Sequence, residues 1–160
     1  MIKNTKTIMF LILFFLSFSI IAAYFIEYVL GHKPCNLCLY QRIPYYVSLL
    51  LVVNIIFFKK FVKISFLILS IVALFGAVLA FYHFGIEQGF FNESIVCKSS
   101  DATNLVSKED LLKQLESNQI SCKEVDFRLY GFSLASINTV FSLVLFYIFG
   151  KLFINYESNR

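Results

Sequence analysis

The chain has 160 residues, of which 59% are hydrophobic and only 15% are charged. Soluble domains carry about 25% charged residues, so this composition excludes an ordinary soluble domain and indicates a single membrane domain over residues 1–160. The formal net charge of +4 does not indicate nucleic acid as a partner, because the basic residues gather at the ends of apolar segments, where membrane orientation accounts for them.

Four apolar segments predict helices that cross a bilayer, which takes about 20 apolar residues each. We expect these helices at about residues 8–30, 37–58, 64–84 and 131–154. The second must begin near Asn36, because a helix starting at Pro44 would be about 22 Å long against a hydrocarbon core of about 30 Å. In the third, small residues at 73, 76, 77 and 80 predict close packing of helices. The fold class expected is an all-α membrane protein, a four-transmembrane-helix bundle.

Lysine and arginine predict how the bundle is oriented. One side of the predicted bundle holds, in short segments, Lys3, Lys6, Lys59, Lys60, Lys63, Lys151 and Arg160. By the positive-inside rule, both termini and the turn at 59–63 are expected in the cytoplasm. The loops at about 31–36 and 85–130 then lie outside with all four cysteines, which in a bacterium means the periplasm, where disulfides persist. The first segment also loosely fits a cleaved signal peptide, but its apolar run continues to Leu30, which favours a retained helix.

Cys35 and Cys38 form a Cys-x-x-Cys pair at the expected start of the second helix. A helix N-terminus stabilises a thiolate through its dipole and its free N–H groups. Arg42 follows Cys38 by four residues, so it would place a positive charge on the same face, beside a thiolate or an electron-accepting headgroup. We interpret the pair as redox-active; a structural disulfide and half of a metal site are the alternatives.

Cys97 and Cys122 lie in the long outer loop. A disulfide between them would close a loop of about 25 residues and could stabilise the fold by up to about 3 kcal/mol. The loop is polar and expected to be exposed, so another protein's thiol could also reach such a bond, and the two cysteine pairs could exchange. Between the two cysteines, Ser107 to Asn118 predicts a short amphipathic helix, which lies either on the membrane or the bundle, or in solvent packed on the loop.

Two further polar residues stand at the outer end of the third segment. His83 and Glu87 are four residues apart and could line a headgroup site or relay protons. The alternative is an interfacial polar cap on a helix end, which is also how we interpret Glu27 on the first helix.

Together these residues resemble a known family. Residues 35–42, Cys-Asn-Leu-Cys-Leu-Tyr-Gln-Arg, resemble the Cys-x-Leu-Cys-x-x-x-Arg stretch of the disulfide bond formation protein B (DsbB) family. The resemblance covers nearly the whole chain, including four spans and a second cysteine pair in the outer loop. It implies a bacterial inner-membrane bundle that reoxidises a periplasmic DsbA-like thioredoxin-fold protein and passes the electrons to ubiquinone or menaquinone.

The resemblance also implies roles for the cysteines. Cys97 would be attacked by the partner, Cys122 would resolve the mixed disulfide, and Cys35 would exchange with this loop pair. Cys38 would contact the quinone.

The quinone headgroup would be held by Arg42, with His83 and Glu87 nearby. Two departures leave the quinone type and the exact partner open: Gln41 stands at a position that is acidic in some members, and the chain has no Trp.

Two other functions fit parts of the pattern. A quinone reductase of the vitamin K epoxide reductase type also uses a four-helix bundle, but its quinone-facing Cys-x-x-Cys lies late in the chain, whereas here it follows the first helix. A metal-binding or structural membrane protein stapled by disulfides is the non-enzyme alternative. Cysteines on an oxidising side favour disulfides over zinc, so we expect no metal.

Overall fold

The structure, a computed structural model, describes residues 3–58, 61–92, 97, 122–123, 128–129 and 131–158. Its helices are α1 (Lys3–Tyr28), α2 (Asn36–Phe58), α3 (Val62–Glu87) and α5 (Leu134–Ser158). Two short antiparallel strands, β1 (Arg128–Leu129) and β2 (Phe132–Ser133), precede α5. The amphipathic helix predicted near 107–118 lies outside the described residues.

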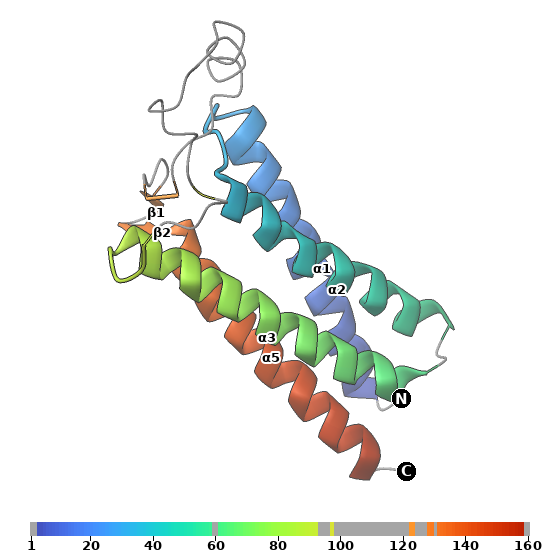
Figure 1. The fold of residues 1–160 in the computed structure, drawn as a ribbon. Helices are drawn as coiled ribbons and strands as arrows, with labels where there is room; N and C mark the ends of the chain where they lie inside the picture. The colour runs from blue at the N-terminus through green and yellow to red at the C-terminus, as the bar shows by residue number, and fades with distance from the viewer. Residues whose placement is uncertain are drawn as a thin grey trace, which may run out of the picture.

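All four helices are long and apolar enough to cross a membrane, and their candidate spans of 23 to 26 residues exceed a hydrocarbon core of about 30 Å. α3 packs most extensively on α5 and also contacts α2, which in turn contacts α1. Figure 1 shows both termini at one end of the bundle and the β1–β2 hairpin at the opposite end. The predicted four-helix membrane bundle is therefore confirmed.

The side chains are distributed as in a protein surrounded by lipid. Large apolar residues face outward along every helix, with Phe14 72% and Phe57 74% exposed. The interior between the helices holds Met9, Phe66 and Phe149, all fully buried. Without a membrane, so much exposed apolar surface would be costly, so the distribution agrees with the hydropathy of the spans.

Small residues let α3 approach its neighbours, as their spacing predicts. Ala73, Gly76, Ala77 and Ala80 are all buried. A Cβ atom on Gly76 would lie 3.3 Å from the Cβ of Pro44 on α2 and 3.6 Å from Ser142 Oγ on α5. Gly76 thus lies where α3 is in close contact with both α2 and α5.

Most helix ends differ from the prediction by a few residues, as in α1, which covers residues 3–28 rather than 8–30, and two of the differences have a clear local cause. α3 continues past residue 84 to Glu87, and Gly89, at φ +78°, closes it with hydrogen bonds from Gly89 N to Ile86 O and from Phe90 N to Gly85 O. α5 begins at Leu134 rather than near 131, because Ser133 Oγ accepts a hydrogen bond from the N–H of Ser136 and caps the helix.

Candidate redox site at the hairpin end of the bundle

Cys35 and Cys38 lie at the start of α2. Cys35 immediately precedes the helix and Cys38 is in its first turn, so the N–H of Cys38 donates a hydrogen bond to Cys35 Sγ at 3.3 Å. The two sulfur atoms are 2.9 Å apart, and both cysteines are free thiols. The turn therefore holds the pair close enough to form a disulfide on oxidation.

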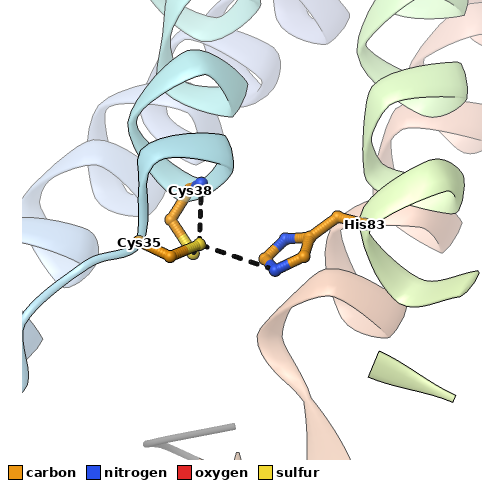
Figure 2. Close-up of side chains that lie close together, drawn as sticks. All are labelled: Cys35, Cys38 and His83. Atoms are coloured by element: carbon orange, nitrogen blue, oxygen red, sulfur yellow. Dashed lines mark hydrogen bonds between the residues drawn. The ribbon is translucent and has the colours of Figure 1, made fainter. Parts of the chain in front are cut away.

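His83, on α3, faces the thiol of Cys35 at the start of α2. Its Nε2 atom lies 3.6 Å from Cys35 Sγ, so α3 contributes directly to the thiol pair (Figure 2). Glu87, one turn later on α3, places its Oε1 atom 3.6 Å from the same nitrogen. His83 and Glu87 are both buried, and Glu87 Oε2 has no hydrogen-bond partner among the described residues.

These contacts favour a thiolate at Cys35. The hydrogen bond with Cys38 has the largest effect, and together with His83 it outweighs burial and lowers the pKa of the Cys35 thiol from 9.0 to about 5. Hydrogen bonding to the charged form and a nearby cation or N–H dipole both act in this direction, while desolvation opposes them. At neutral pH, Cys35 is thus the nucleophilic sulfur of the pair.

The outer-loop cysteines are joined to each other and packed against the first pair. Cys97 and Cys122 form a disulfide, and both are buried in a cluster with Cys35, Leu37 and Ile86. The expectation that this bond would be exposed on a polar loop is wrong. The apolar surface at the ends of α2 and α3 covers it, which leaves 2% of Cys97 and 1% of Cys122 accessible.

Arg42 is directed to α1. Its Nη1 atom lies 2.6 Å from Glu27 Oε2, and its guanidinium lies 5.0 Å from the centre of the Tyr24 ring. The structure therefore brings Cys35, Cys38, His83 and Glu87 together, whereas the contacts described for Arg42 are to Glu27 and Tyr24. Glu27, which we had interpreted as an interfacial cap, is the ionic partner of Arg42.

Three polar residues that sequence reasoning did not assign to the site extend it into the bundle. Gln41 Nε2 donates to His83 Nδ1 at 2.9 Å, and Asn138 Nδ2 donates to Gln41 Oε1 at 2.7 Å. Tyr45 O–H donates to Asn138 Oδ1 at 2.6 Å. Sequence reasoning could have found Gln41 and Asn138, because polar side chains are rare inside membrane-spanning segments and require partners there.

Two kinds of chemistry suit these residues. A thiolate, a neighbouring thiol and a buried disulfide are the components of thiol–disulfide exchange. Cys35, Cys38 and His83 also place their ligand atoms within 4.8 Å of one another, which a soft metal ion could use. Only the first kind involves Cys97 and Cys122, which lie in the same cluster as Cys35.

The chain has recognisable relatives. It is 26% identical over 150 residues to an uncharacterized protein of Rickettsia prowazekii (strain Madrid E), covering 91% of this chain and 87% of that protein. It is 36% identical over 99 residues to the SPbeta prophage-derived disulfide bond formation protein B of Bacillus subtilis (strain 168), covering 59% of this chain and 64% of that protein. No solved structure matches the chain.

The family comparison covers nearly the entire chain. The sequence model described as "Disulfide bond formation protein DsbB" matches residues 5–152, a range that includes the four helices almost completely and all four cysteines. The chain therefore belongs to the disulfide bond formation protein B family, and it is a multi-pass membrane disulfide oxidoreductase.

Proposed function

We propose that the protein oxidises the dithiol of a thioredoxin-fold protein on the outer side of a bacterial inner membrane and transfers the electrons to a membrane quinone. First, the partner's dithiol reduces the Cys97–Cys122 disulfide, and the partner leaves with a disulfide. The Cys97 and Cys122 thiols then reduce a Cys35–Cys38 disulfide, which regenerates the loop disulfide. Oxidation of the Cys35 and Cys38 thiols finally delivers two electrons and two protons to the quinone.

The observation that carries this proposal is the shared burial of the two cysteine pairs. Cys35 lies in one cluster with Cys97 and Cys122, so exchange between the pairs needs no large movement of helices. The arrangement, with a loop disulfide and two free thiols in the turn, corresponds to the stage just before electrons leave for the quinone. Once the Cys35–Cys38 disulfide has been reduced, Cys35 is released as a stable thiolate, since its pKa is lowered to about 5.

The residues around Cys38 suit a quinone as electron acceptor. Cys38 is partly exposed at the start of a membrane-spanning helix, where a lipid-soluble molecule has access. Arg42, one turn on, places Nη1 at 2.6 Å from Glu27 Oε2, and because a guanidinium has five N–H donors, it could also donate to a headgroup oxygen. His83 and Glu87 are proposed to stand near the headgroup on the other side of the thiol pair.

The proposed membrane sidedness rests on charge. Figure 1 shows the start of α3 and the end of α5 at the end of the bundle that carries the termini, and the start of α2 at the opposite end. Lys63 lies in the first turn of α3 and Lys151 in the last third of α5, whereas Cys35 and Cys38 lie at the start of α2. The positive-inside rule then assigns the termini to the cytoplasm and the redox site to the oxidising side. A thioredoxin-fold dithiol protein, which is DsbA-like, is the proposed partner on that side.

The test is quinone reduction by purified full-length protein in detergent, with a reduced thioredoxin-fold protein as the electron donor. Wild type should consume ubiquinone or menaquinone continuously. Cys38→Ser should oxidise about one equivalent of donor through the loop disulfide and then stop without reducing quinone. Cys97→Ser is the matched control, and it should not oxidise the donor.

Two outcomes would contradict the proposal. Continued quinone reduction by Cys38→Ser would exclude the proposed role of Cys38. Absence of turnover in wild type with either quinone and several donors, together with a metal ion that copurifies with the protein, would favour the metal-binding alternative supported by the Cys35, Cys38 and His83 donors.

A further inference from the structure

A chain of hydrogen bonds leads from His83 into the bundle. It passes from His83 on α3 to Gln41 on α2, then to Asn138 on α5, and ends at Tyr45 on α2. His83 is 3% and Gln41 7% exposed, and all four side chains belong to candidate membrane spans. Inside a membrane protein such groups must satisfy one another, so the direction of each hydrogen bond constrains the next.

The deep end of this chain fixes the orientation of Asn138. Asn138 Oδ1 faces the hydroxyls of Tyr45, at 2.6 Å, and Ser142, at 3.4 Å, and accepts a hydrogen bond from each with its two lone pairs. The Asn138 amide nitrogen then points to Gln41 and requires an oxygen there. Gln41 consequently presents its own nitrogen to His83, because a primary amide has one oxygen and one nitrogen.

The groups at the outer end of the hydrogen-bond series agree with this direction. Since Gln41 donates to Nδ1, this nitrogen must carry a lone pair and no proton. The imidazole proton is then on Nε2, which faces Cys35 Sγ and Glu87 Oε1, each at 3.6 Å. Both of these atoms are acceptors when ionised, so a lone pair on Nε2 would be repelled there.

We propose that Gln41, Asn138 and Tyr45 are positioning residues that hold His83 as the neutral tautomer with its proton on Nε2, as a fixed hydrogen-bond donor to Cys35. Turning over the amide groups of Gln41 and Asn138 would reverse the direction of the hydrogen bonds between these residues and His83. Nε2 of the neutral imidazole would then carry a lone pair and accept a hydrogen bond from the Cys35 thiol. The observed direction excludes that use of His83. His83 therefore stabilises the Cys35 thiolate by donation and does not remove its proton.

The groups around the imidazole of His83 are consistent with this role as a donor. Its ring is faced by Cys35 just before α2, by Gln41 on α2, by Glu87 on its own helix and by the backbone of Cys122, whereas Asn138 acts on it through Gln41. Figure 2 shows the ring of His83 projecting from α3 toward Cys35 at the start of α2. Nδ1 has an amide donor in front of it, so a second proton at Nδ1 requires Gln41 to turn over.

Nitrogen NMR of the imidazoles tests the proposed tautomer of His83 directly, because the protein has only two histidines, His32 and His83. Reduced full-length protein labelled with ¹⁵N-histidine would be measured in detergent at neutral pH, and His32→Gln would assign the signals. A protonated and an unprotonated ring nitrogen have well-separated shifts. Wild type should show His83 with Nδ1 unprotonated and Nε2 protonated.

Three variants test the chain at a distance from the ring. In Asn138→Leu, Gln41 is free to turn its oxygen to His83, so the Nδ1 signal should move to the protonated position. Tyr45→Phe should move it partway, since Ser142 still donates to Asn138. Tyr46→Phe is the matched control, because its hydroxyl bonds the exposed Tyr24 hydroxyl at 2.7 Å instead, and it should change nothing.

Several results would overturn the inference. These are a protonated Nδ1 in wild type, identical His83 signals in wild type and Tyr45→Phe, or an equal shift in Tyr46→Phe. If Asn138→Leu fails to fold, the conservative pair Tyr45→Phe and Tyr46→Phe still decides. The measurement uses neither quinone nor partner, so its failure would leave the proposed redox function to be judged by its own assay.

Discussion

The reactivity of Cys35 depends on its neighbour, so removing the Cys38 side chain should change the pH at which Cys35 becomes nucleophilic. The hydrogen bond with the Cys38 side chain lowers the pKa of Cys35 most, and hydrogen bonds with His83 and with the Cys38 backbone act in the same direction. Burial opposes them, yet the pKa falls from 9.0 to about 5. Loss of a hydrogen-bond partner of a charged group commonly shifts its pKa by about one pH unit or more.

The measurable quantity is the midpoint pH of Cys35 alkylation, followed by mass spectrometry of the peptide that contains it. Wild type in the reduced state should give a midpoint near 5, and Cys38→Ala should raise it by more than about one pH unit. Cys38→Ser keeps an O–H donor and should raise it less. The rate at pH 7 is a poor substitute, because a thiolate of lower pKa is also less nucleophilic, by about 40- to 100-fold over four pKa units.

The reasoning would be refuted by a wild-type midpoint near 9, the ordinary value for a thiol, or by a Cys38→Ala midpoint equal to that of wild type. A variant outside the site, Tyr46→Phe, controls for general effects of substitution on α2. Because Cys35 is 6% exposed, a small alkylating reagent is needed, and slow absolute rates leave the midpoint unaffected.

Three other predictions concern the packing and the shielding of the site. Gly76→Leu should lower the free energy of unfolding in detergent by about 1–3 kcal/mol, because its side chain would enter the 3.3 Å approach to Pro44; an unchanged unfolding curve would contradict this. Glu27→Gln should raise the KM for quinone several-fold with a smaller effect on kcat, since Arg42 loses the 2.6 Å partner that orients it; an unaltered KM would argue against a headgroup role for Arg42. A water-soluble phosphine should reduce the disulfide of Cys97 at least about ten times more slowly in the folded protein than in the denatured protein, because only 2% of this residue is exposed. Equal reduction rates would show that the burial does not persist in solution.

The sequence predicted the parts of this protein that depend on hydropathy and spacing. Four apolar segments give four helices because length and composition alone decide whether a helix can span a bilayer. The requirement that α2 begin near Asn36 followed from the same arithmetic, and it placed Cys38 in the first turn. The family followed from the spacing of cysteines and arginine, a local pattern that needs no tertiary structure.

Contacts between helices could not be predicted in the same way. The spacing of four between Cys38 and Arg42 did not predict the contact with Glu27, because the rotation of α1 against α2 is set by packing along both helices. The same holds for Asn138, which meets Gln41 across 97 positions of sequence. The burial of Cys97 was missed because a polar loop suggests exposure, whereas the ends of α2 and α3 supply the apolar cover.

The burial of the loop disulfide has opposite consequences for two steps of the proposed cycle. A cluster that excludes water keeps small reductants from the disulfide and places Cys97 and Cys122 beside Cys35 for exchange. The same cover blocks a protein-sized partner, whose thiol cannot reach a residue that is 2% exposed. In the proposed cycle, docking of the partner would have to displace the loop cysteines from Leu37 and Ile86 before attack, at a cost that grows with the apolar area uncovered. Binding energy from the partner's surface would offset that cost, whereas a free thiol brings none.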